Sequence, residues 1–581
     1  MTIGREPDDV PSVPSWDPAT IAASDSPTVS RELVKLLSKL GVEQAYGVVG
    51  GAIAAFCRAV WQRPIRYVHC RHETGAVFAA IEASLASGRP TVVFVTTGPG
   101  VTNAMTGMVA ARWEGATVIL VSAVSSPSQR GRGAAQETSA STLPFSAFYT
   151  AGPVFDFATV LENVAELPTV AARLTAGLTR DEGFVAHIGL PLSVQSATTL
   201  ALPRPALTQG RAAGAHPQTV AECVELLRQE RFVVWTGFGS RRASSAIRRF
   251  VEMTGAAVIT SPRGKGIFPE HHPQFVGVTG LGGHVRVEAF MAREQPQRAL
   301  VLGSRLGEGT SAWSRSLAPK RGFIHVDIDA DVFGAAYQMV PTYGVQADVE
   351  AFIEQLIDQW PRHAEPLPSP PSVDLPSKSA RVEPQPGRSP VRPQVLMAAI
   401  QRAVIDGSDA IVLAESGNSF VWTTHMLEFR TPHRYRVSPG FGAMGHTACG
   451  VVGAALGSNR PAVAIVGDGA MLMQNEVSTA VQYGVPAVWI VLNDSVYSIC
   501  DQGMRSFGWQ AFETELPACN YALIAEAMGA RGMRVSREDE VEGAIAAAVA
   551  ARCPFVLDVH IDREEWAPAS QRNKSLMAQG I

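Results

Sequence analysis

Two aspartates stand directly after short apolar segments and could together bind a divalent metal ion. Asp468 lies in a Gly-Asp-Gly turn that follows residues 463–466, and Asp494 follows residues 486–492. The residues between them have room for one crossover helix, and in a right-handed strand–helix–strand unit both strands end at the same edge of the sheet. Carboxylate and backbone carbonyl oxygens are ligands that Mg²⁺ accepts. We therefore expect the two carboxylates to meet at a metal site.

The residues around Asp468 also suit a phosphate group. Gly467 and Gly469 allow close approach of the backbone to a ligand, and the helix that begins near Ala470 presents its first amides to an anion. A Gly-Asp-Gly tripeptide alone can be no more than a turn. With Asp494 in the expected second position, we predict that a Mg²⁺-bound polyphosphate lies over this turn.

A glutamate at the start of a helix is a further candidate for chemistry. Glu73 follows one expected strand and opens a helix at 73–86, where the helix dipole alone would favour a carboxylate. Glycine-rich turns at 50–51 and 98–100 follow other expected strands of the same sheet. Ligands bind outside the carboxyl ends of the strands in such sheets, so we expect Glu73 and Gly50 to lie at a binding edge.

The segments that must position these residues alternate between strand and helix along the chain. This alternation predicts an α/β protein with three doubly wound parallel-sheet domains. The expected boundaries are a flexible N-terminal extension at 1–27, a first domain at 28–202, a middle domain at 203–362, a Pro-rich linker at 363–393, and a third domain with a C-terminal tail at 394–581.

The composition excludes several classes of protein. The 581 residues are 46% apolar, which is enough for several cores, and the net charge of −4 without a long basic block disfavours a nucleic-acid partner. The seven cysteines are scattered and form no CxxC pair, which indicates a reducing compartment. No apolar run approaches ~18 residues and no signal pattern opens the chain, so we expect a cytoplasmic protein without a membrane partner.

Several of these motifs resemble those of a known family. The Gly-Asp-Gly turn with its downstream Asp494, and Arg-His-Glu-Thr-Gly-Ala at 71–76, are similar to segments of the thiamine-diphosphate-dependent enzyme superfamily, in particular acetolactate synthases and 2-oxo acid decarboxylases. The resemblance covers about residues 28–562 and implies pyrimidine-binding, middle and diphosphate-binding domains in that order. It implies thiamine diphosphate and Mg²⁺ as cofactors, with Asp468, Asp494 and the carbonyl of Val496 as metal ligands. The commonest motif has Asn at 494, so this Asp adds a negative charge beside the diphosphate.

By the same resemblance, further residues of the third domain contact the cofactor. The segment at 438–445 is similar to the superfamily's Gly-x-Met-Gly turn, in which Gly442 offers its carbonyl to the 4′-amino group and Met444 fills the bend between the two rings. Asn418 and Ser419 would contact the diphosphate, although both residue types also suit a plain turn. The expected cofactor contacts are Gly50, Glu73, Asn418, Ser419, Gly442, Met444, Gly467, Asp468, Gly469, Ala470, Asp494, Val496 and Tyr497.

Two residues of the first domain are the expected catalysts. The resemblance assigns Glu73 as the carboxyl group that, in a dry pocket, shares a proton with N1′ of the aminopyrimidine. Gln136 lies in a segment similar to the Phe-Gln-Glu segment of acetolactate synthases, with Ala135 in place of the Phe. It could donate a hydrogen bond to the substrate, and a glutamine on a surface loop is the alternative reading.

The leading hypothesis for the function is a carboligase. Such an enzyme decarboxylates a 2-oxo acid such as pyruvate and couples the product to a second carbonyl, giving an acetohydroxy acid or acyloin, as a transferase or lyase. Aldehyde-releasing relatives often carry a tandem His pair in the loop after the fourth strand, and this loop has none. A decarboxylase that releases an aldehyde, a 2-hydroxyacyl-CoA lyase and a non-catalytic subunit of the same fold remain alternatives.

The resemblance also bears on other ligands and on assembly. Gly303-Ser-Arg305 lies where acetolactate synthases have a longer segment that touches FAD, but the acidic pair and second Arg of that segment are missing, so FAD is possible and not favoured. We expect a homodimer or homotetramer with shared active sites, in which Glu73 and Asp468 come from different subunits. His446 is a candidate phosphate contact, and Cys500 is a candidate for shaping the choice of acceptor.

Overall fold

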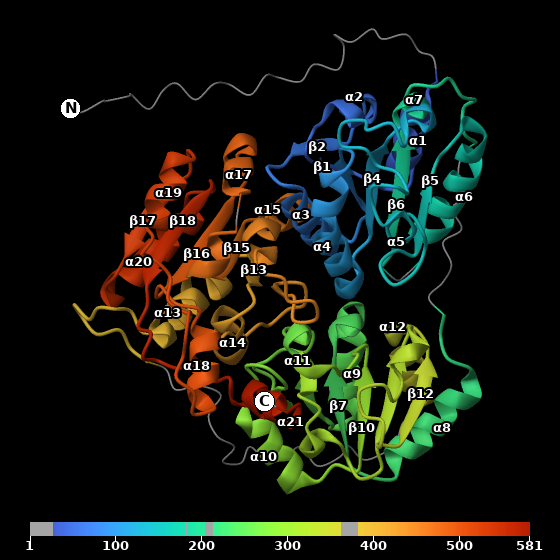
Figure 1. Ribbon diagram of the computed structural model, residues 1–581. Coiled ribbons are helices and arrows are strands. Elements are labelled where there is room, and N and C mark those ends of the chain that lie inside the picture. The colour runs from blue at the N-terminus through green and yellow to red at the C-terminus, as the bar shows by residue number, and fades with distance from the viewer. Residues whose placement is uncertain (1–26, 181–182, 204–212, 362–381, 474, 581) are drawn as a thin grey trace, which may run out of the picture.

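The computed structural model shows three domains, each built on one six-stranded sheet (Figure 1). It describes residues 27–180, 183–203, 213–361, 382–473 and 475–580. Every strand pair within the three sheets is parallel, which confirms the expected α/β class. Of the expected extension at 1–27 and linker at 363–393, only residue 27 and residues 382–393 belong to the described part of the chain.

The first sheet has the strand order β2-β1-β3-β4-β6-β5. Its strands are β1 (Gln44–Gly47), β2 (Arg66–His69), β3 (Thr91–Val95), β4 (Val118–Val124), β5 (Phe157–Val160) and β6 (Val185–Pro191). The helices of this domain are α1 (Val29–Lys39), α2 (Ala54–Trp61), α3 (Glu73–Ser87), α4 (Pro99–Glu114), α5 (Phe145–Phe148), α6 (Leu167–Leu178) and α7 (Leu192–Gln195). Central strands such as β4 are buried along their whole length, which is why they are continuous apolar runs in the sequence.

The middle sheet has the order β12-β11-β10-β7-β8-β9. Its strands are β7 (Phe232–Thr236), β8 (Ala257–Thr260), β9 (Phe275–Val278), β10 (Arg298–Leu302), β11 (Phe323–Asp327) and β12 (Thr342–Gln346). Its helices are α8 (Pro217–Arg228), α9 (Ser244–Thr254), α10 (Val285–Glu294), α11 (Glu308–Ser311) and α12 (Val349–Gln359). The edge strand β12 lies beyond β11 and completes this sheet. Only Val345 of β12 is buried, so this strand lacks an apolar run in the sequence.

The third sheet has the order β14-β13-β15-β16-β18-β17. Its strands are β13 (Ile411–Ala414), β14 (Tyr435–Val437), β15 (Ala462–Gly467), β16 (Ala487–Asn493), β17 (Arg531–Val535) and β18 (Phe555–His560). Its helices are α13 (Pro393–Ile400), α14 (Asn418–Met426), α15 (His446–Ser458), α16 (Asp468–Met471), α17 (Val477–Tyr483), α18 (Ser498–Ser506), α19 (Tyr521–Ala527), α20 (Glu538–Ala550) and α21 (Ser570–Ala578). Between Asp468 and Asp494 the chain forms two short helices, α16 and α17, where we expected one.

The first and third domains share one topology. When the strands are numbered within each sheet, both orders are 2-1-3-4-6-5, whereas the middle sheet follows the dinucleotide-binding order 3-2-1-4-5-6. The helices that follow the second strands, α3 and α15, pack against each other where the two domains meet (Figure 1). None of the described helices combines the length and the apolar composition that crossing a bilayer requires.

Glycines on α15 allow this close packing. A Cβ atom on Gly453 would lie 1.8 Å from the carbonyl oxygen of Ala79, and one on Gly457 would lie 2.5 Å from that of Ala83. Real Cβ atoms do not approach backbone atoms this closely. The two domains are therefore joined within one chain by direct contact between helix backbones.

Candidate functional site

The carboxyl ends of four neighbouring strands carry the expected cofactor contacts of the third domain. In the order β14-β13-β15-β16, each strand is followed by one group of these residues. The groups are Gly442 and Met444 after β14, Asn418 and Ser419 after β13, Gly467, Asp468, Gly469 and Ala470 after β15, and Asp494, Val496 and Tyr497 after β16. Since parallel strands end at one edge, residues up to about eighty positions apart share one binding edge.

The two aspartates lie next to each other at this edge. The carboxylate of Asp468 is 4% exposed and accepts hydrogen bonds of 2.7 Å from the backbone N–H groups of Gly469 and Ser495. The residue beside Ser495 is Asp494, whose carboxylate accepts a hydrogen bond from the Ser498 hydroxyl. The backbone N–H of Ser498 donates to the carbonyl of Val496 at 2.8 Å.

Burial and mutual repulsion disfavour the charged forms of these carboxyl groups. Burial raises the pKa of Asp468, which its backbone hydrogen bonds only partly offset. Burial raises the pKa of Asp494 to about 7; the Ser498 hydrogen bond opposes this shift, and the nearby charge of Asp468 adds to it. A divalent cation would offset both charges. Among the described residues, no cluster of three or more His, Cys, Asp or Glu side chains forms a metal cage, so such an ion needs further oxygen ligands.

Tyrosines fix the Gly-Asp-Gly turn from two sides. A Cβ atom on Gly469 would lie 2.3 Å from the Tyr497 ring, so only glycine fits at this contact. The hydroxyl of Tyr521 donates a 2.9 Å hydrogen bond to the backbone carbonyl of Asp468. The sequence analysis missed Tyr521, because it lies in α19, which has no recognisable motif.

Asn418 and Ser419 form the first turn of α14, after Gly417 with a φ of 105°. The Ser419 hydroxyl donates to the carbonyl of Glu415 at 2.8 Å. The amide nitrogen of Asn418 donates to Gln502 at 3.1 Å, while its Oδ1 atom is buried without a partner in the described structure. An orphaned acceptor of this kind fits a site that is completed by a ligand.

The turn with Gly442 and Met444 is anchored by a buried carboxylate. Gly442 and Gly445 adopt φ values of 65° and 85°, and the Met444 side chain is 39% exposed. Glu415 accepts hydrogen bonds of 3.0 and 3.2 Å from the backbone N–H groups of Thr447 and Ala448, at the start of α15. Glu415, which sequence reasoning also missed, thus ties the end of β13 to the helix that follows the turn.

Glu73 is buried at the corresponding edge of the first sheet. It is 8% exposed, and its Oε2 atom accepts a 3.1 Å hydrogen bond from the Asn103 amide of α4. The helix begins here because Nδ1 of His72 caps the N–H of Thr74 at 3.2 Å. Gly100 lies beside the carboxyl group: a Cβ atom on it would lie 3.5 Å from Oε1 of Glu73, an ordinary van der Waals distance.

Gln136 lies against the same glycine turn. It is exposed and has a φ of 53°, and a Cβ atom on Gly98 would lie 3.0 Å from its carbonyl oxygen. The neighbouring Glu137 accepts hydrogen bonds from the backbone N–H groups of Gly131 and Gly133, which holds the loop closed. Gly50, after β1, packs on Thr96 of this edge.

A second buried glutamate joins the two edges within one chain. Glu476 lies between α16 and α17 and accepts hydrogen bonds from the backbone N–H groups of Arg71 and His72, just before Glu73. Its side chain touches Gly75, where a Cβ atom would lie 2.6 Å from Oε1. This contact between distant segments leaves no local signal in the sequence.

His446 and Cys500 lie apart from these groups. His446 is 2% exposed, stacks on Phe78 and places Nε2 3.0 Å from Oε1 of Glu82. Burial opposes protonation of His446, but the hydrogen bond and charge of Glu82 outweigh it and raise the pKa. The structure therefore places this ring between α3 and α15, where it pairs with a carboxylate. Cys500 is exposed on α18.

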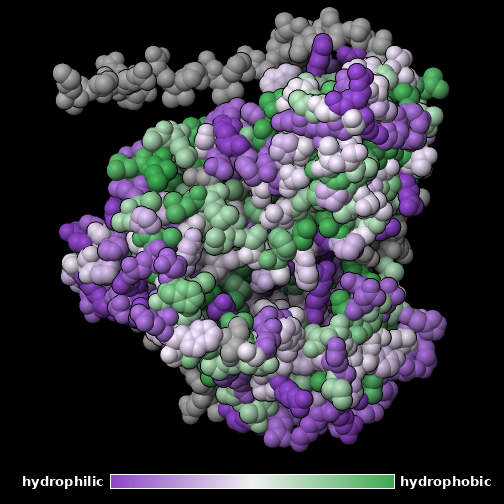
Figure 2. Space-filling view, in the orientation of Figure 1, coloured by the Kyte–Doolittle hydropathy of each residue, from purple (hydrophilic) through white to green (hydrophobic). Residues whose placement is uncertain are grey.

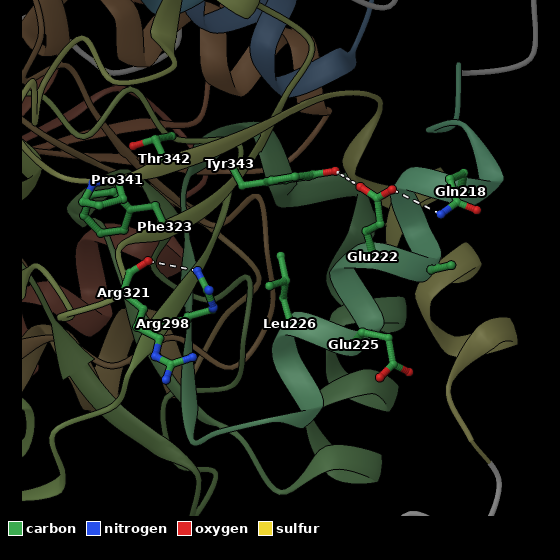
Figure 3. Close-up of a pocket in the computed structure, with 11 residues that line it drawn as sticks. Gln218, Glu222, Glu225, Leu226, Arg298, Arg321, Phe323, Pro341, Thr342 and Tyr343 are labelled. Atoms are coloured by element: carbon green, nitrogen blue, oxygen red, sulfur yellow. Dashed lines mark hydrogen bonds between the residues drawn. The ribbon is translucent and has the colours of Figure 1, made fainter.

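A separate groove of about 680 Å³ lies on the middle domain between α8 and the starts of β10, β11 and β12 (Figure 3). Tyr343 points toward Glu222 and donates a 2.6 Å hydrogen bond to it, and Gln218 donates to the same carboxylate at 3.2 Å. Because the groove lies at the amino-terminal edge of its sheet, it is not part of the candidate site.

Known proteins match this arrangement along most of the chain. Three family models match: the N-terminal TPP binding domain of thiamine pyrophosphate enzymes at 27–143, their central domain at 220–356 and their C-terminal TPP binding domain at 415–559. An acetolactate synthase large subunit of Mycobacterium tuberculosis is 26% identical over 587 residues, with 95% of this chain and 92% of the relative covered. A probable acetolactate synthase large subunit of Methanocaldococcus jannaschii is 26% identical over 565 residues (92% of each chain). The isozyme 1 large subunit of Escherichia coli is 26% identical over 543 residues (92% and 94%).

These matches cover the two sheet edges described above and the domain between them. The N-terminal and C-terminal family models are both named for the binding of thiamine pyrophosphate, which is thiamine diphosphate. The chain therefore belongs to the thiamine-diphosphate-dependent enzyme superfamily and, within it, is similar to acetolactate synthase large subunits.

Proposed function

We propose that this protein is a thiamine-diphosphate- and Mg²⁺-dependent carboligase, which decarboxylates a pyruvate-like 2-oxo acid and joins the product to a second carbonyl compound. The observation that carries the proposal is the pairing of a buried Glu73 at one sheet edge with Asp468 and Asp494 at the other. The printed names of the relatives, acetolactate synthases, support the same reaction class.

The residues of the third domain fit the cofactor. Asp468, Asp494 and the carbonyl of Val496 would hold Mg²⁺, which the raised pKa values of the two aspartates support. Asn418 lies at the start of α14, where the first backbone N–H groups of the helix can face the diphosphate. When bound, thiamine diphosphate supplies a carbon nucleophile and an electron sink for decarboxylation.

The first domain provides the proton chemistry. The Glu73 carboxyl group is buried and receives one hydrogen bond, from Asn103, which orients its other oxygen for proton exchange with a ligand. Met444, on the facing domain, would shape the ring-binding part of the cleft, since its side chain is 39% exposed. Water is excluded from this part of the cleft only when another group covers the Met444 side chain.

The loop with Gln136 favours carboligation over aldehyde release. Aldehyde release requires an acid that protonates the product carbon. The acidic residue beside Gln136 in this loop is Glu137. Its carboxylate accepts hydrogen bonds from two backbone N–H groups and from the Ser139 hydroxyl, so it is held as an acceptor. Gln136 is exposed and free to donate to a substrate.

We propose that FAD is not required. Gly303, in the turn after β10, packs on the turn after β7, and its carbonyl accepts a 2.9 Å hydrogen bond from Gly239. Arg305 turns toward the first domain, where its guanidinium carbon lies 5.7 Å from the centroid of a Trp113 ring. At the crevice where the strand order reverses, the two glycine turns are thus in direct contact, and Arg305 is engaged with the first domain.

A second copy of the chain would complete the site. Four apolar side chains beside the third-domain edge are 37–50% exposed: Phe441, Met444, Leu472 and Met473. Apolar residues, green in Figure 2, are more frequent near the centre of the face shown there than at its lower edge. Covering these side chains would be favourable, which supports a homodimer or homotetramer with shared sites.

The decisive experiment is a product analysis. The purified protein with Mg²⁺ and thiamine diphosphate is incubated with a panel of 2-oxo acids, with and without aldehyde or 2-oxo acid acceptors, and the products are identified by mass. A ligated product with loss of CO₂ is expected. Free aldehyde alone would instead support a decarboxylase, cleavage of 2-hydroxyacyl-CoA a lyase, and no turnover a non-catalytic subunit.

Glu73→Gln is the matched control for this assay. The variant should bind cofactor with nearly unchanged affinity in calorimetry and lose activity by roughly 10²-fold or more, since it keeps the shape and removes the proton. Unchanged turnover would overturn the role of Glu73.

A further inference from the structure

Three arginine side chains surround one aromatic ring at the junction of the three domains. The guanidinium carbons of Arg263, Arg241 and Arg436 lie 3.9, 4.3 and 4.8 Å from the centroid of the Phe238 ring. Arg241 and Arg263 belong to the middle domain, and Arg436 lies on β14 of the third domain. All three guanidinium groups lie against the same ring, so their positive charges are close together. They repel one another where little water screens them.

The first domain supplies two carboxylates to this cluster. Glu82 lies 2.9 Å from Nε of Arg436, and Glu114 lies 2.7 Å from a terminal nitrogen of Arg263. Glu82 also contacts His446 at 3.0 Å, so its charge is divided between two basic partners. Two carboxylates, one of which is shared with His446, therefore face three positively charged guanidinium groups.

Arg241 is the arginine without a carboxylate. Within the described parts of the chain it forms no ion pair, and its terminal nitrogen donates only to the carbonyl of Phe238 at 3.3 Å. Burial, followed by the charges of Arg436, Arg242 and Arg263, lowers the pKa of Arg241 to about 9. The Nε–H group of Arg263 is also buried without an acceptor among the described residues. The guanidinium group of Arg241, which has no carboxylate partner, and the unpaired Nε–H group of Arg263 together favour a negatively charged partner.

The cluster encloses a cavity that can take such a partner. The cavity measures about 10 Å³, and its polar lining and aromatic wall come from Phe238, Arg241, Arg263, Lys265, His433 and Arg436. This volume is about the least that one water molecule needs, so the slightly larger chloride ion enters when the long, part-exposed side chain of Arg241 moves outward. Lys265 adds no net charge, because its ammonium group lies 2.8 Å from the buried Glu270 carboxylate.

We propose that this cavity binds one small inorganic anion, of the size of chloride, between Arg241 and the Nε–H group of Arg263. The anion balances the excess positive charge of three arginines, which come from the middle and third domains and are paired with only two carboxylates of the first domain. Because it binds the folded chain, it stabilises the joined arrangement of the domains.

Thermal unfolding of the full chain in different salts tests the proposal. At constant ionic strength and pH, replacing gluconate by chloride or bromide should raise the unfolding midpoint by a few degrees in a saturable way. Phosphate, which is larger, should give only the gradual, non-saturating rise of an anion that is excluded from protein surfaces. A rise with phosphate and none with chloride would overturn the assignment to a small anion.

Arg241→Met separates the anion site from a general salt effect. The variant removes the uncompensated charge, so its midpoint in gluconate should exceed that of the wild type, and its response to chloride should vanish. The control Arg248→Met removes an exposed arginine of α9, paired with Glu252 at 2.8 Å, and should keep the full response. A chloride response that survives in Arg241→Met would refute the site.

Crystals of the wild-type protein grown in bromide provide a direct second test. An anomalous peak is expected beside Arg241 and Arg263. A map without a peak at this place, with bromide located elsewhere in the same crystal, would overturn the proposal even if the variants failed to fold.

Discussion

At the scale of single residues, the choice of Asp at 494 sets the electrostatics of the candidate metal site. Burial and the neighbouring charge of Asp468 raise the pKa of Asp494 to about 7. A buried Asn would bring no such charge. The Ser498 hydroxyl donates a hydrogen bond to the Asp494 carboxylate and partly stabilises its charged form.

The first prediction concerns the pH dependence of metal binding at Asp494. Mg²⁺ requires the ionised carboxylate, so its apparent affinity should fall roughly tenfold between pH 7.5 and pH 6 in the wild-type protein. In Asp494→Asn this dependence should largely disappear. Calorimetric titration with Mg²⁺ in the presence of thiamine diphosphate measures both proteins.

By the same pKa shift, the first prediction extends to the stability of the metal-free protein. A carboxyl group whose pKa is raised on folding binds its proton more tightly in the folded state, so its contribution to stability increases as the pH falls from about 7 towards 4. Over this window, the unfolding midpoint of the metal-free wild type should gain relative to that of Asp494→Asn. Parallel midpoints of the two proteins would contradict the raised pKa.

At the scale of elements, the contact between α3 and α15 joins the two domains that carry the site. The residues that make it possible are small: Gly453 faces the backbone of Ala79, and Gly457 that of Ala83. Helix propensity alone would favour alanine at these positions. The glycines are therefore explained by packing between domains and not by the local structure of α15.

The second prediction follows from this contact. Gly453→Ala places a methyl group where the Ala79 carbonyl stands and should destabilise the protein by about 2 kcal/mol or more, because neither backbone can move freely. Gly543→Ala is the matched control, since nothing lies within 4 Å of a Cβ atom there on α20. It should stabilise the helix by about 0.5–1 kcal/mol. Chemical denaturation of both variants measures the difference, and equal effects would contradict the packing argument.

At the scale of the whole molecule, the first and third domains repeat one topology around the middle domain. Because both sheets have the order 2-1-3-4-6-5, the second strand lies at the outside of each sheet, next to the first. Glu73 and the turn with Met444 follow the second strands of the two sheets. The two halves of the proposed site are thus built from the same element of a repeated fold.

The third prediction tests whether these halves come from two copies of the chain. Glu73→Gln and Asp468→Ala are each expected to be inactive alone. If the sites are shared, dissociating and reassembling a mixture of both should restore about a quarter of the wild-type activity, because half of the dimers are mixed and each has one intact site. An activity that stays absent in a mixture with proven subunit exchange would show that each site lies within one chain.

The sequence by itself determined the class of fold and was enough to name the residues of the candidate site. Strands buried on both faces are legible as apolar runs, and the glycine turns, Glu73, Asp468 and Asp494 stand directly at their ends, so local pattern suffices to find them. The edge strand β12, of which only Val345 is buried, leaves no apolar run in the sequence and was therefore missed. The division between α16 and α17 was missed because it does not change the apolar pattern.

Only the tertiary structure decided which residues support that site. The carboxylates of Glu476 and Glu82 meet partners more than 350 positions away in the chain, and the arginines around Phe238 converge from two domains. Such pairings depend on how whole helices and sheets pack, and a buried carboxylate is tolerated only where that packing brings hydrogen-bond donors or an opposite charge to it. No stretch of sequence contains this information, because it arises from contacts between segments that fold separately.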